Sequence, residues 1–305
     1  MSNRTTSWLL LVFLALIWGS SFILMKRAMF TIDEKPIFND TQVGALRMFI
    51  AALVLLPFAL KDIKLLKNWK TFGKLAIVGF CGNFFPAFLF TYAETGISSG
   101  YAGMLNSCVP IFAILIGAFV FKDRLTRIQL IGILIGTGGV ISLMIAGQNL
   151  SISGNWTHVF AIVIATICYA ISLNIIRYTL SHLKSFQIAS LAFLITILPS
   201  TIITIQQDVV GTFQTTEGSG NGLIAIIVLS VIGTAFALIV FNRLIAASSV
   251  LFASSVTYLI PIVAVVIGLS FGEEINTWQI ASMAVVISGV FIANAAKRKK
   301  QPSRV

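Results

Sequence analysis

The composition of this 305-residue chain excludes an ordinary soluble protein. Hydrophobic residues make up 57% of it, charged residues make up only 10%, and its mean hydropathy is +0.97. Because soluble domains carry about 25% charged residues, this chain cannot cover its surface with polar groups in water. The net charge of +11 would favour nucleic acid in a soluble protein, but the basic residues lie in short clusters between apolar runs. The sequence therefore predicts an all-α integral membrane protein that contacts the lipid bilayer and has no nucleic-acid partner.

Ten apolar runs follow one another along the chain, each close to the about 20 residues that a helix needs to cross a bilayer. The five runs in the first half cover residues 7–29, 41–60, 73–93, 98–121 and 126–146. The five in the second half cover residues 157–178, 186–206, 222–242, 248–271 and 276–296. The connections between them are short, so the sequence predicts ten transmembrane helices and no soluble domain.

Lysine and arginine are concentrated in every second connection. If the amino terminus is cytoplasmic, 17 of the 21 basic residues lie in cytoplasmic segments, among them five lysines between residues 61 and 74. Eight of the ten acidic residues then lie on the outer side. Because basic residues are enriched in cytoplasmic loops, we expect a multi-pass protein of the cell membrane with both termini in the cytoplasm.

The two halves of the chain resemble each other at a constant offset of 151 residues. Residues 98–142 align without a gap on residues 249–293, with 10 identities in 45 positions. The identities include Pro110 with Pro261, Gly117 with Gly268, Thr126 with Thr277 and Gly138 with Gly289. The same offset relates three pairs in the first and sixth runs: Trp18 with Tyr169, Ser21 with Ser172 and Lys26 with Arg177.

Each half holds five predicted helices, an odd number, so the two halves must be inverted relative to each other in the membrane. Inverted repeats around a central site are the architecture of secondary transporters. The chain thus divides into a first five-helix repeat over residues 1–147, a second over residues 148–296, and a basic cytoplasmic tail over residues 297–305.

Four segments carry a resemblance to a known family. Residues 15–23 read ALIWGSSFI, residues 47–53 read RMFIAAL, and residues 98–126 contain a central proline and end in KDRLT. The second half repeats the last pattern with YLIP at residues 258–261 and the acidic pair Glu273-Glu274. In order and spacing these segments resemble the EamA family of the drug/metabolite transporter superfamily, although Asp123 stands where that family usually has glutamate. The resemblance implies ten helices around a central cavity and export or exchange of small metabolites, often amino acids or related compounds.

Polar and aromatic side chains inside the predicted helices are the candidates for binding a solute. Trp18 and Tyr169 lie near the middle of their runs, too deep for the interfacial positions that Trp and Tyr usually occupy. A polar atom at that depth needs a partner, which either a wet cavity or a local hydrogen bond between packed helices supplies. The candidate substrate-binding residues are Trp18, Ser21, Asn83, Tyr101, Asn106, Tyr169, Ser172 and Tyr258.

Three charged side chains lie toward the outer ends of the predicted helices: Lys26, Arg47 and Glu94. Arg47 lies about 9 Å inside the end of its run, at 1.5 Å per residue. An ionisable residue at this depth indicates a functional role. We expect a gating or structural ion pair with Glu94, with direct binding of a substrate carboxylate as the alternative. No acidic residue lies deep inside a run, so the sequence favours facilitated transport or exchange over proton coupling.

Several small or cyclic residues predict how the helices bend and pack. Pro86, Pro110 and Pro261 each remove a backbone hydrogen bond, which predicts kinks or hinges. Gly132 and Gly136 are four residues apart, a spacing that favours close helix contacts within the chain. The cysteines fall inside apolar runs at Cys81, Cys108 and Cys168, and we expect them to act as small buried hydrophobic residues.

These features predict a secondary transporter that exports a small metabolite by alternating access. An organellar exchanger of sugar phosphates or nucleotide sugars is one alternative, but its anionic cargo would require several basic residues in the cavity. A membrane enzyme acting on lipid is another, but it would require a cluster of His, Asp or Glu at one membrane face, and a scaffold would leave the repeat unexplained. Because no metal-ligand cluster, catalytic triad or nucleotide motif occurs in the sequence, we expect neither enzymatic activity nor a cofactor or metal.

Overall fold

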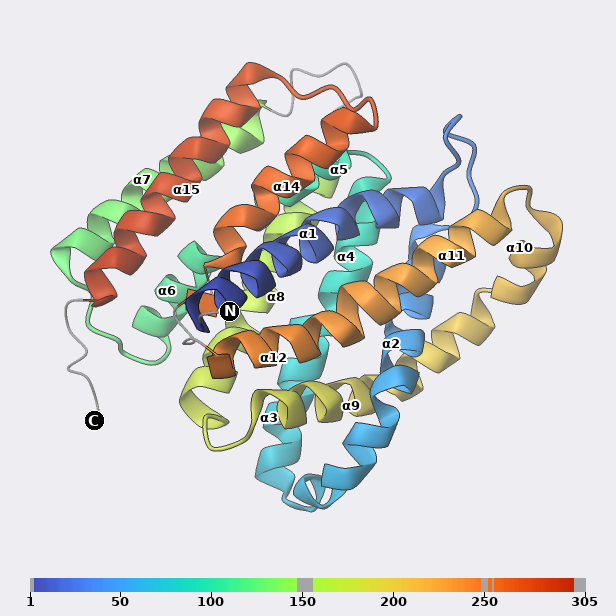
Figure 1. Cartoon of the computed structure of the whole chain (residues 1–305), viewed down its shortest axis with the longest axis horizontal. Helices are drawn as coiled ribbons and strands as arrows, with labels where there is room; N and C mark the ends of the chain where they lie inside the picture. Colours follow the sequence, from blue (N-terminus) through green and yellow to red (C-terminus); the bar gives the residue numbers. More distant parts are fainter. Residues whose placement is uncertain (1–2, 147–155, 248–251, 254, 299–305) are drawn as a thin grey trace.

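The computed structural model of the chain describes residues 3–146, 156–247, 252–253 and 255–298. Over these ranges the chain is all-α, and an isolated bridge between Phe30 and Pro36 is the β pairing found there. The helices of the first half are α1 (Asn3–Met29), α2 (Asp40–Asp62), η1 (Ile63–Lys67), α3 (Trp69–Gly79), η2 (Phe80–Phe84), α4 (Phe85–Glu94), α5 (Ser99–Asn106), α6 (Val109–Phe119) and α7 (Arg127–Ala146). Those of the second half are α8 (Trp156–Thr179), α9 (Ser185–Gln206), α10 (Val209–Thr215), α11 (Ser219–Ser230), η4 (Val231–Phe236), α12 (Ala237–Ala247), α14 (Val256–Ser270) and α15 (Thr277–Arg298) (Figure 1).

Eight helical segments in the described part of the chain are long and apolar enough to cross a membrane. They coincide with the first eight predicted runs: Thr5–Met29, Asp40–Lys67, Trp69–Glu94, Ser99–Phe119, Arg127–Ala146, Trp156–Thr179, Ser185–Gln206 and Ser219–Phe241. The last two predicted runs contain shorter apolar helices, Val256–Ser270 and Thr277–Ala293. Three parts of the prediction lie outside the described residues: the start of run 248–271, the repeat boundary at residues 147 and 148, and tail residues 299–305. A count of ten spanning helices therefore stays a prediction.

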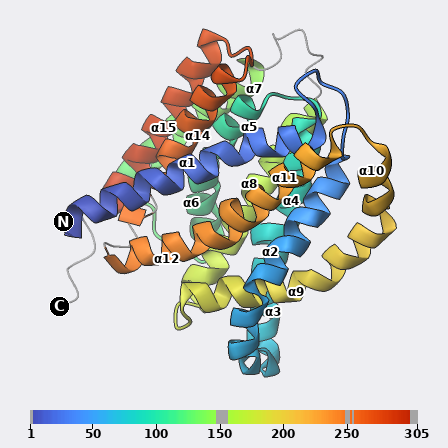
Figure 2. The same ribbon diagram turned by 45° about the vertical axis from the view of Figure 1, so that its right-hand side comes forward.

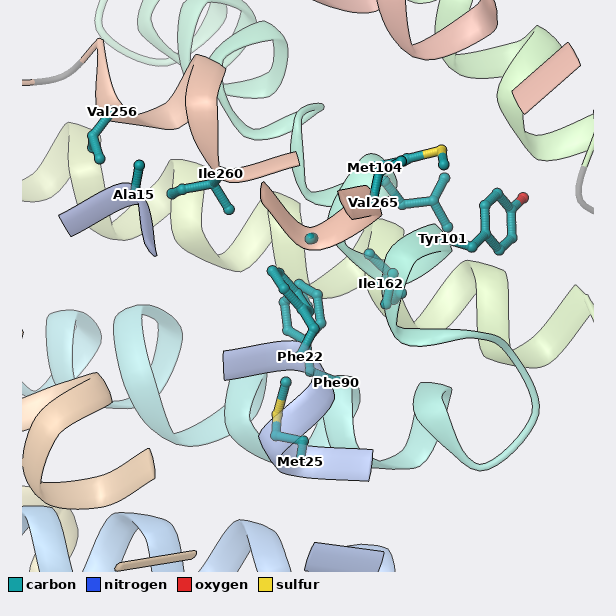
Figure 3. Close-up of a cluster of buried hydrophobic side chains, with 14 of the residues drawn as sticks. Ala15, Phe22, Met25, Phe90, Tyr101, Met104, Ile162, Val256, Ile260 and Val265 are labelled. Atoms are coloured by element: carbon teal, nitrogen blue, oxygen red, sulfur yellow. The ribbon is translucent and has the colours of Figure 1, made fainter. Parts of the chain in front are cut away.

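The first helix of each half packs into the other half. Helix α1 packs against α14, α11 and α12, whereas α8 packs against α4, α6 and α3. The largest buried cluster accordingly joins side chains from both halves, among them Phe22 of α1, Phe90 of α4, Ile162 of α8 and Ile260 of α14 (Figure 3). The main core therefore lies between the halves, and neither half buries it alone.

Two symmetrical helix pairs lie at opposite edges of this core. Figures 1 and 2 show α7 beside α15 at one edge and α2 beside α9 at the other. Large apolar side chains are exposed on the outside of these pairs, for example Leu134 (72% exposed) and Leu198 (67% exposed). Exposed apolar surface of this extent is typical of a face that contacts lipid or another protein.

Glycines allow α7 and α15 to touch along their backbones. The helices run antiparallel, because Gly132 lies against Ala293 and Gly139 against Val286. A Cβ added to Gly132 would lie 2.5 Å from the backbone nitrogen of Ala293. Gly136 lies at the same interface, beside Ile111 and Gly289. The prediction that Gly132 and Gly136 serve helix contacts within the chain is thus confirmed.

The register between the repeats shifts by one residue in the loops that precede α7 and α15. The side-chain oxygen of Gln129 accepts a hydrogen bond from the backbone nitrogen of Thr126 (2.9 Å), and that of Gln279 accepts one from Asn276 (3.1 Å). Each pair caps the start of its helix. Thr126 therefore corresponds in the structure to Asn276, at an offset of 150, and not to Thr277 as in the gapless alignment.

The glycines of the same helices show the same shift. Gly139 faces α15 and Gly289 faces α7, whereas Gly138 has no atom of another element within 4 Å of an added Cβ. The structural counterpart of Gly289 is thus Gly139, not the Gly138 that the sequence alignment pairs with it. The loop before α15 is one residue shorter than the loop before α7, which accounts for the change in offset from 151 to 150.

Candidate functional site

Two membrane-spanning helices lose their α-helical regularity at equivalent positions. The π-helical segment η2 interrupts the third span between α3 and α4, and η4 interrupts the eighth span between α11 and α12. Their first residues, Phe80 and Val231, are again 151 positions apart. Because π-helical turns are rare and are frequently found at functional sites, this matched pair marks the candidate site.

Each π segment is crossed by the first helix of the other half. Gly82 of η2 lies against Ser172 of α8, and an added Cβ there would clash with the Ser172 hydroxyl. Gly233 of η4 lies against Ser21 of α1, whose Oγ would be 3.2 Å from an added Cβ. Both the glycines and the serines are related by the offset of 151, so the two crossings are symmetrical copies. Ser21 also donates a hydrogen bond to the carbonyl oxygen of Ile17 (3.0 Å).

The predicted aromatic residues lie three positions before these serines. The half-buried ring of Trp18 lies 5.4 Å from that of Phe241 in α12. The half-buried ring of Tyr169 lies 6.0 Å from that of Phe90 in α4. Asn83, also half-buried, lies within η2 itself. The structure therefore brings Trp18, Ser21, Asn83, Tyr169 and Ser172 to the two crossings.

Arg47 lies next to the second crossing. Its Nε donates to Oγ1 of Thr234 in η4 (3.4 Å), and its Nη1 lies 3.4 Å from Sδ of Met25 in α1. Arg47 also interacts electrostatically with Tyr169 of α8 and Glu94 of α4. These neighbours belong to helices of both halves, so the half-buried side chain of Arg47 lies between the two halves.

Glu94 ends α4 in a buried position. The residue is 1% exposed, and neither carboxylate oxygen has a hydrogen-bond partner among the described residues. It interacts electrostatically with Lys26, Arg47 and Glu273, but the expected direct ion pair with Arg47 is not formed in this structure. The ion pair found in the described part of the chain joins Arg177 and Asp123 instead (3.4 Å). A buried polar group without a hydrogen-bond partner costs free energy, and a buried ionisable residue in a membrane protein indicates function.

The remaining three candidates have other surroundings. The hydroxyl of Tyr101 donates to the backbone oxygen of Leu143 (3.0 Å), which joins α5 to α7. Asn106, at the end of α5, has a buried Oδ1 without a partner among the described residues. Tyr258 of α14 packs against the buried cluster around Ile111 and Val286. For Tyr101, the hydrogen bond that joins α5 to α7 is a sufficient structural role.

The three prolines lie in different helical contexts. Pro86 lies at the start of α4, directly after η2, and Pro110 lies at the start of α6, where Ser107 and Cys108 separate that helix from α5. Pro261 lies inside α14, which continues through it.

Sequence reasoning missed the two π segments and the glycines within them. The signal was present, because Gly82 and Gly233 are one more identical pair at the offset of 151. It also missed that the thiols of Cys81 and Cys168 interact at the crossing of η2 with α8. Of the three cysteines Cys108 is buried, as expected, whereas Cys81 and Cys168 are half-buried.

Comparison with known proteins agrees with the doubled architecture. The model of the EamA-like transporter family matches this chain twice, over residues 6–145 and 156–295. The chain belongs to the EamA-like transporter family. This EamA-like protein is similar to YedA of Escherichia coli K12, described as an uncharacterized inner membrane transporter, with 26% identity over 288 residues that cover 93% of this chain and 89% of YedA.

Two further similarities are more limited. A probable amino-acid metabolite efflux pump of Salmonella typhimurium is 39% identical over 71 residues, which cover 22% of this chain and 24% of that protein. A solved crystal structure matches with a TM-score of 0.62 and 15% identity, over 98% of this chain and 99% of that one, which supports the fold alone. The family and its named relatives point to a membrane transporter and not to an enzyme.

Proposed function

We propose that this EamA-like protein is a secondary transporter that exports a small metabolite, an amino acid or a related compound, across the cell membrane by alternating access. The observation that carries the proposal is the pair of symmetrical crossings, Gly82 with Ser172 and Gly233 with Ser21. In transporters built from inverted repeats, solutes bind near the middle of the membrane, where helices of both repeats are interrupted. Here both interruptions meet the first helix of the opposite half.

The side chains around the crossings favour an amino-acid-like solute. The guanidinium of Arg47 has donors that suit a carboxylate, and Trp18 and Tyr169 offer aromatic surface to an apolar side chain. Asn83 adds an amide that can both donate and accept hydrogen bonds. The relative described as an amino-acid metabolite efflux pump supports the same class of solute and the direction of transport.

A sugar-phosphate or nucleotide-sugar exchanger is less well supported. Such cargo carries two or more negative charges. The basic groups available to it are Arg47 and Lys26, and the acidic Glu94 interacts electrostatically with both. Two basic groups with an acidic residue near them suit a single carboxylate better than a phosphate ester.

Metabolite profiling tests the proposal. The wild-type protein and a Trp18→Ala variant are expressed at equal membrane levels, and small metabolites are measured inside the cells and in the medium. We expect one class of compound to accumulate in the medium with the wild type and not with Trp18→Ala. A matched control is Trp278→Ala, because Trp278 is 61% exposed on α15 and its removal should leave transport unchanged.

Two results would contradict the proposal in different ways. Equal export by the wild type and Trp18→Ala would keep the transporter and remove the proposed site. No redistribution by folded wild-type protein across a broad metabolite panel would remove the transport function itself.

A further inference from the structure

A loop of the first half holds the end of a helix of the second half. The hydroxyl of Tyr178, near the end of α8, donates to Oδ2 of Asp123, and Nη1 of Arg177 lies 3.4 Å from the same oxygen. The ring of Tyr178 stacks on Phe121 with centroids 4.3 Å apart. We call Phe121, Asp123, Arg177 and Tyr178 the Asp123 cluster.

The repeat contains a second copy of this cluster, made of Phe271, Glu273, Lys26 and Arg27. Lys26 and Arg27 precede Arg177 and Tyr178 by 151 positions, and Phe271 and Glu273 come after Phe121 and Asp123 by the 150 positions that hold in these loops. We call this second copy the Glu273 cluster.

The backbone around the two acidic residues supports the equivalence. Lys122 before Asp123 has a φ of 58°, and Gly272 before Glu273 has a φ of 83°. The backbone nitrogen of Asp123 donates to the carbonyl of Gly117 (3.0 Å), and that of Glu273 donates to the equivalent Gly268 (2.9 Å).

The two clusters lie at opposite ends of the molecule. Asp123 lies in the loop that leads into α7, and Glu273 lies in the loop that leads into α15. Because α7 and α15 run antiparallel side by side (Figure 1), their first residues lie at opposite ends of the pair. In a membrane these ends face opposite sides.

The contacts between charged groups are made in one cluster and not in the other. Both oxygens of Glu273 accept backbone hydrogen bonds at the start of α5, from Ser99 and Gly100 (2.8 Å each). Arg27 retains its aromatic contact, with the guanidinium 5.3 Å from the centroid of Phe271, but it donates to the backbone of Thr31 (3.0 Å). Its buried Nε has no hydrogen-bond partner among the described residues.

Lys26 is also kept away from Glu273. No ion pair within 4 Å joins Lys26 to an acidic residue in the described part of the chain, although Lys26 and Glu273 both interact electrostatically with Glu94. The basic and acidic groups of the Glu273 cluster are therefore close to one another but not paired. Glu273 and Arg27 form hydrogen bonds with backbone groups outside the cluster instead.

We propose that the two clusters are alternating latches for the transport cycle, an inference that rests on the proposed alternating access. In the state seen here the Asp123 cluster closes its end, and the Glu273 cluster is open. In the opposite state Glu273 leaves the start of α5 and binds Lys26 and Arg27, while Asp123 releases Arg177 and Tyr178. One set of charged contacts replaces the other, so the two states stay close enough in free energy to interconvert.

Disulfide cross-linking in membranes tests the latches without a known solute. Cys81, Cys108 and Cys168 are first replaced by alanine, because Cys81 and Cys168 interact with each other. A probe pair, Lys26→Cys with Glu273→Cys, then reports closure of the Glu273 cluster, and a disulfide forms when a thiol oxidant removes two electrons and two protons from the pair. Asp123→Asn is added to weaken the opposite latch.

We expect Asp123→Asn to raise the rate of cross-linking of the probe pair at least about fivefold, because it weakens the contacts of the state in which that pair is apart. Asp62→Asn is the matched control, since the Asp62 carboxylate accepts a hydrogen bond from Gln187 (2.8 Å) outside both clusters. It should leave the rate unchanged. A second pair, Ser142→Cys with Ser282→Cys, tests whether each variant is folded. The two serine hydroxyls are 2.8 Å apart across α7 and α15, so this pair should cross-link equally in every folded variant.

An unchanged rate with Asp123→Asn would overturn the latches. These results are separate from the transport assay: a protein that transports but does not alternate in cross-linking loses the latches alone. One that alternates in cross-linking without moving any metabolite keeps the two latches and loses the proposed transport function.

Discussion

The guanidinium of Arg47 is held inside the bundle by several weak interactions rather than by one ion pair. Thr234 and Met25 lie 3.4 Å from its nitrogens, and Glu94 acts on it from a longer distance. A bidentate pair with Glu94 would occupy the donors that a carboxylate ligand needs. The absence of that pair in this state leaves Arg47 available, which supports its place in the proposed site.

Tyr101 gives a prediction of the opposite kind, because its hydroxyl already bonds to the backbone of Leu143 (3.0 Å). We expect Tyr101→Phe to lower the free energy of unfolding by about 1 kcal/mol, the usual contribution of one hydrogen bond. Transport per folded molecule should not change. Thermal unfolding in detergent, measured beside transport, checks both parts. A variant of normal stability with altered solute preference would instead return Tyr101 to the binding site.

At the scale of helices, the contact between α7 and α15 depends on glycines that face the partner. A Cβ on Gly139 would lie 2.7 Å from the backbone nitrogen of Val286, whereas a Cβ on the neighbouring Gly138 would meet nothing within 4 Å. We expect Gly139→Ala to destabilise the protein by about 1–3 kcal/mol, the cost of overpacking. Gly138→Ala, the matched control, should be neutral or stabilising by about 0.5–1 kcal/mol.

Melting temperatures in one detergent compare the two alanine variants directly. The comparison also tests the repeat register, since the gapless sequence alignment makes Gly138 the counterpart of Gly289 and the structure makes it Gly139. A larger loss of stability with Gly138→Ala would favour the alignment and contradict the helix contact.

For the first eight runs the ends of the helices could be predicted from the sequence to within four residues, except that run 41–60 continues through η1 to Lys67. A run of about 20 apolar residues is a strong local signal, because only a helix satisfies its backbone in lipid. The π segments, the break between α5 and α6, and the packing of α1 and α8 into opposite halves depend on contacts far apart in the sequence. The prolines are the local signal for two of these features, since Pro86 lies at the start of α4 just after η2 and Pro110 lies just after the break between α5 and α6.

The candidate site was predicted in part for the same reason. The repeat offset identified Trp18, Ser21, Tyr169 and Ser172 as related pairs, and the structure places both pairs at the crossings. Nothing in the sequence distinguished Tyr101, whose partner is a backbone carbonyl on another helix.

At the scale of the whole molecule, the frame is symmetrical but the charges at the site are not. The repeat counterparts of Arg47 and Glu94 are Leu198 and Ile245, so only one half supplies the charged groups beside the crossings. In the proposed alternating access, the two states would therefore share similar helix packing and present different electrostatic surroundings to the solute. Similar packing favours interconversion, and different surroundings favour binding on one side and release on the other.

The orientation of the protein in the membrane is predicted from the distribution of its basic residues. With the amino terminus inside, 17 of the 21 basic residues are cytoplasmic, and the lysines of η1 and the start of α3 are among them. We expect a fluorescent protein fused after Val305 to fold and fluoresce in the cytoplasm. Alkaline phosphatase, which is active only outside the cytoplasm, should be active when fused after Glu217 and inactive when fused after Lys67. The reverse pattern at these three positions would show that the chain is inserted the other way, and it would place the closed Asp123 cluster at the outer face instead of the cytoplasmic one.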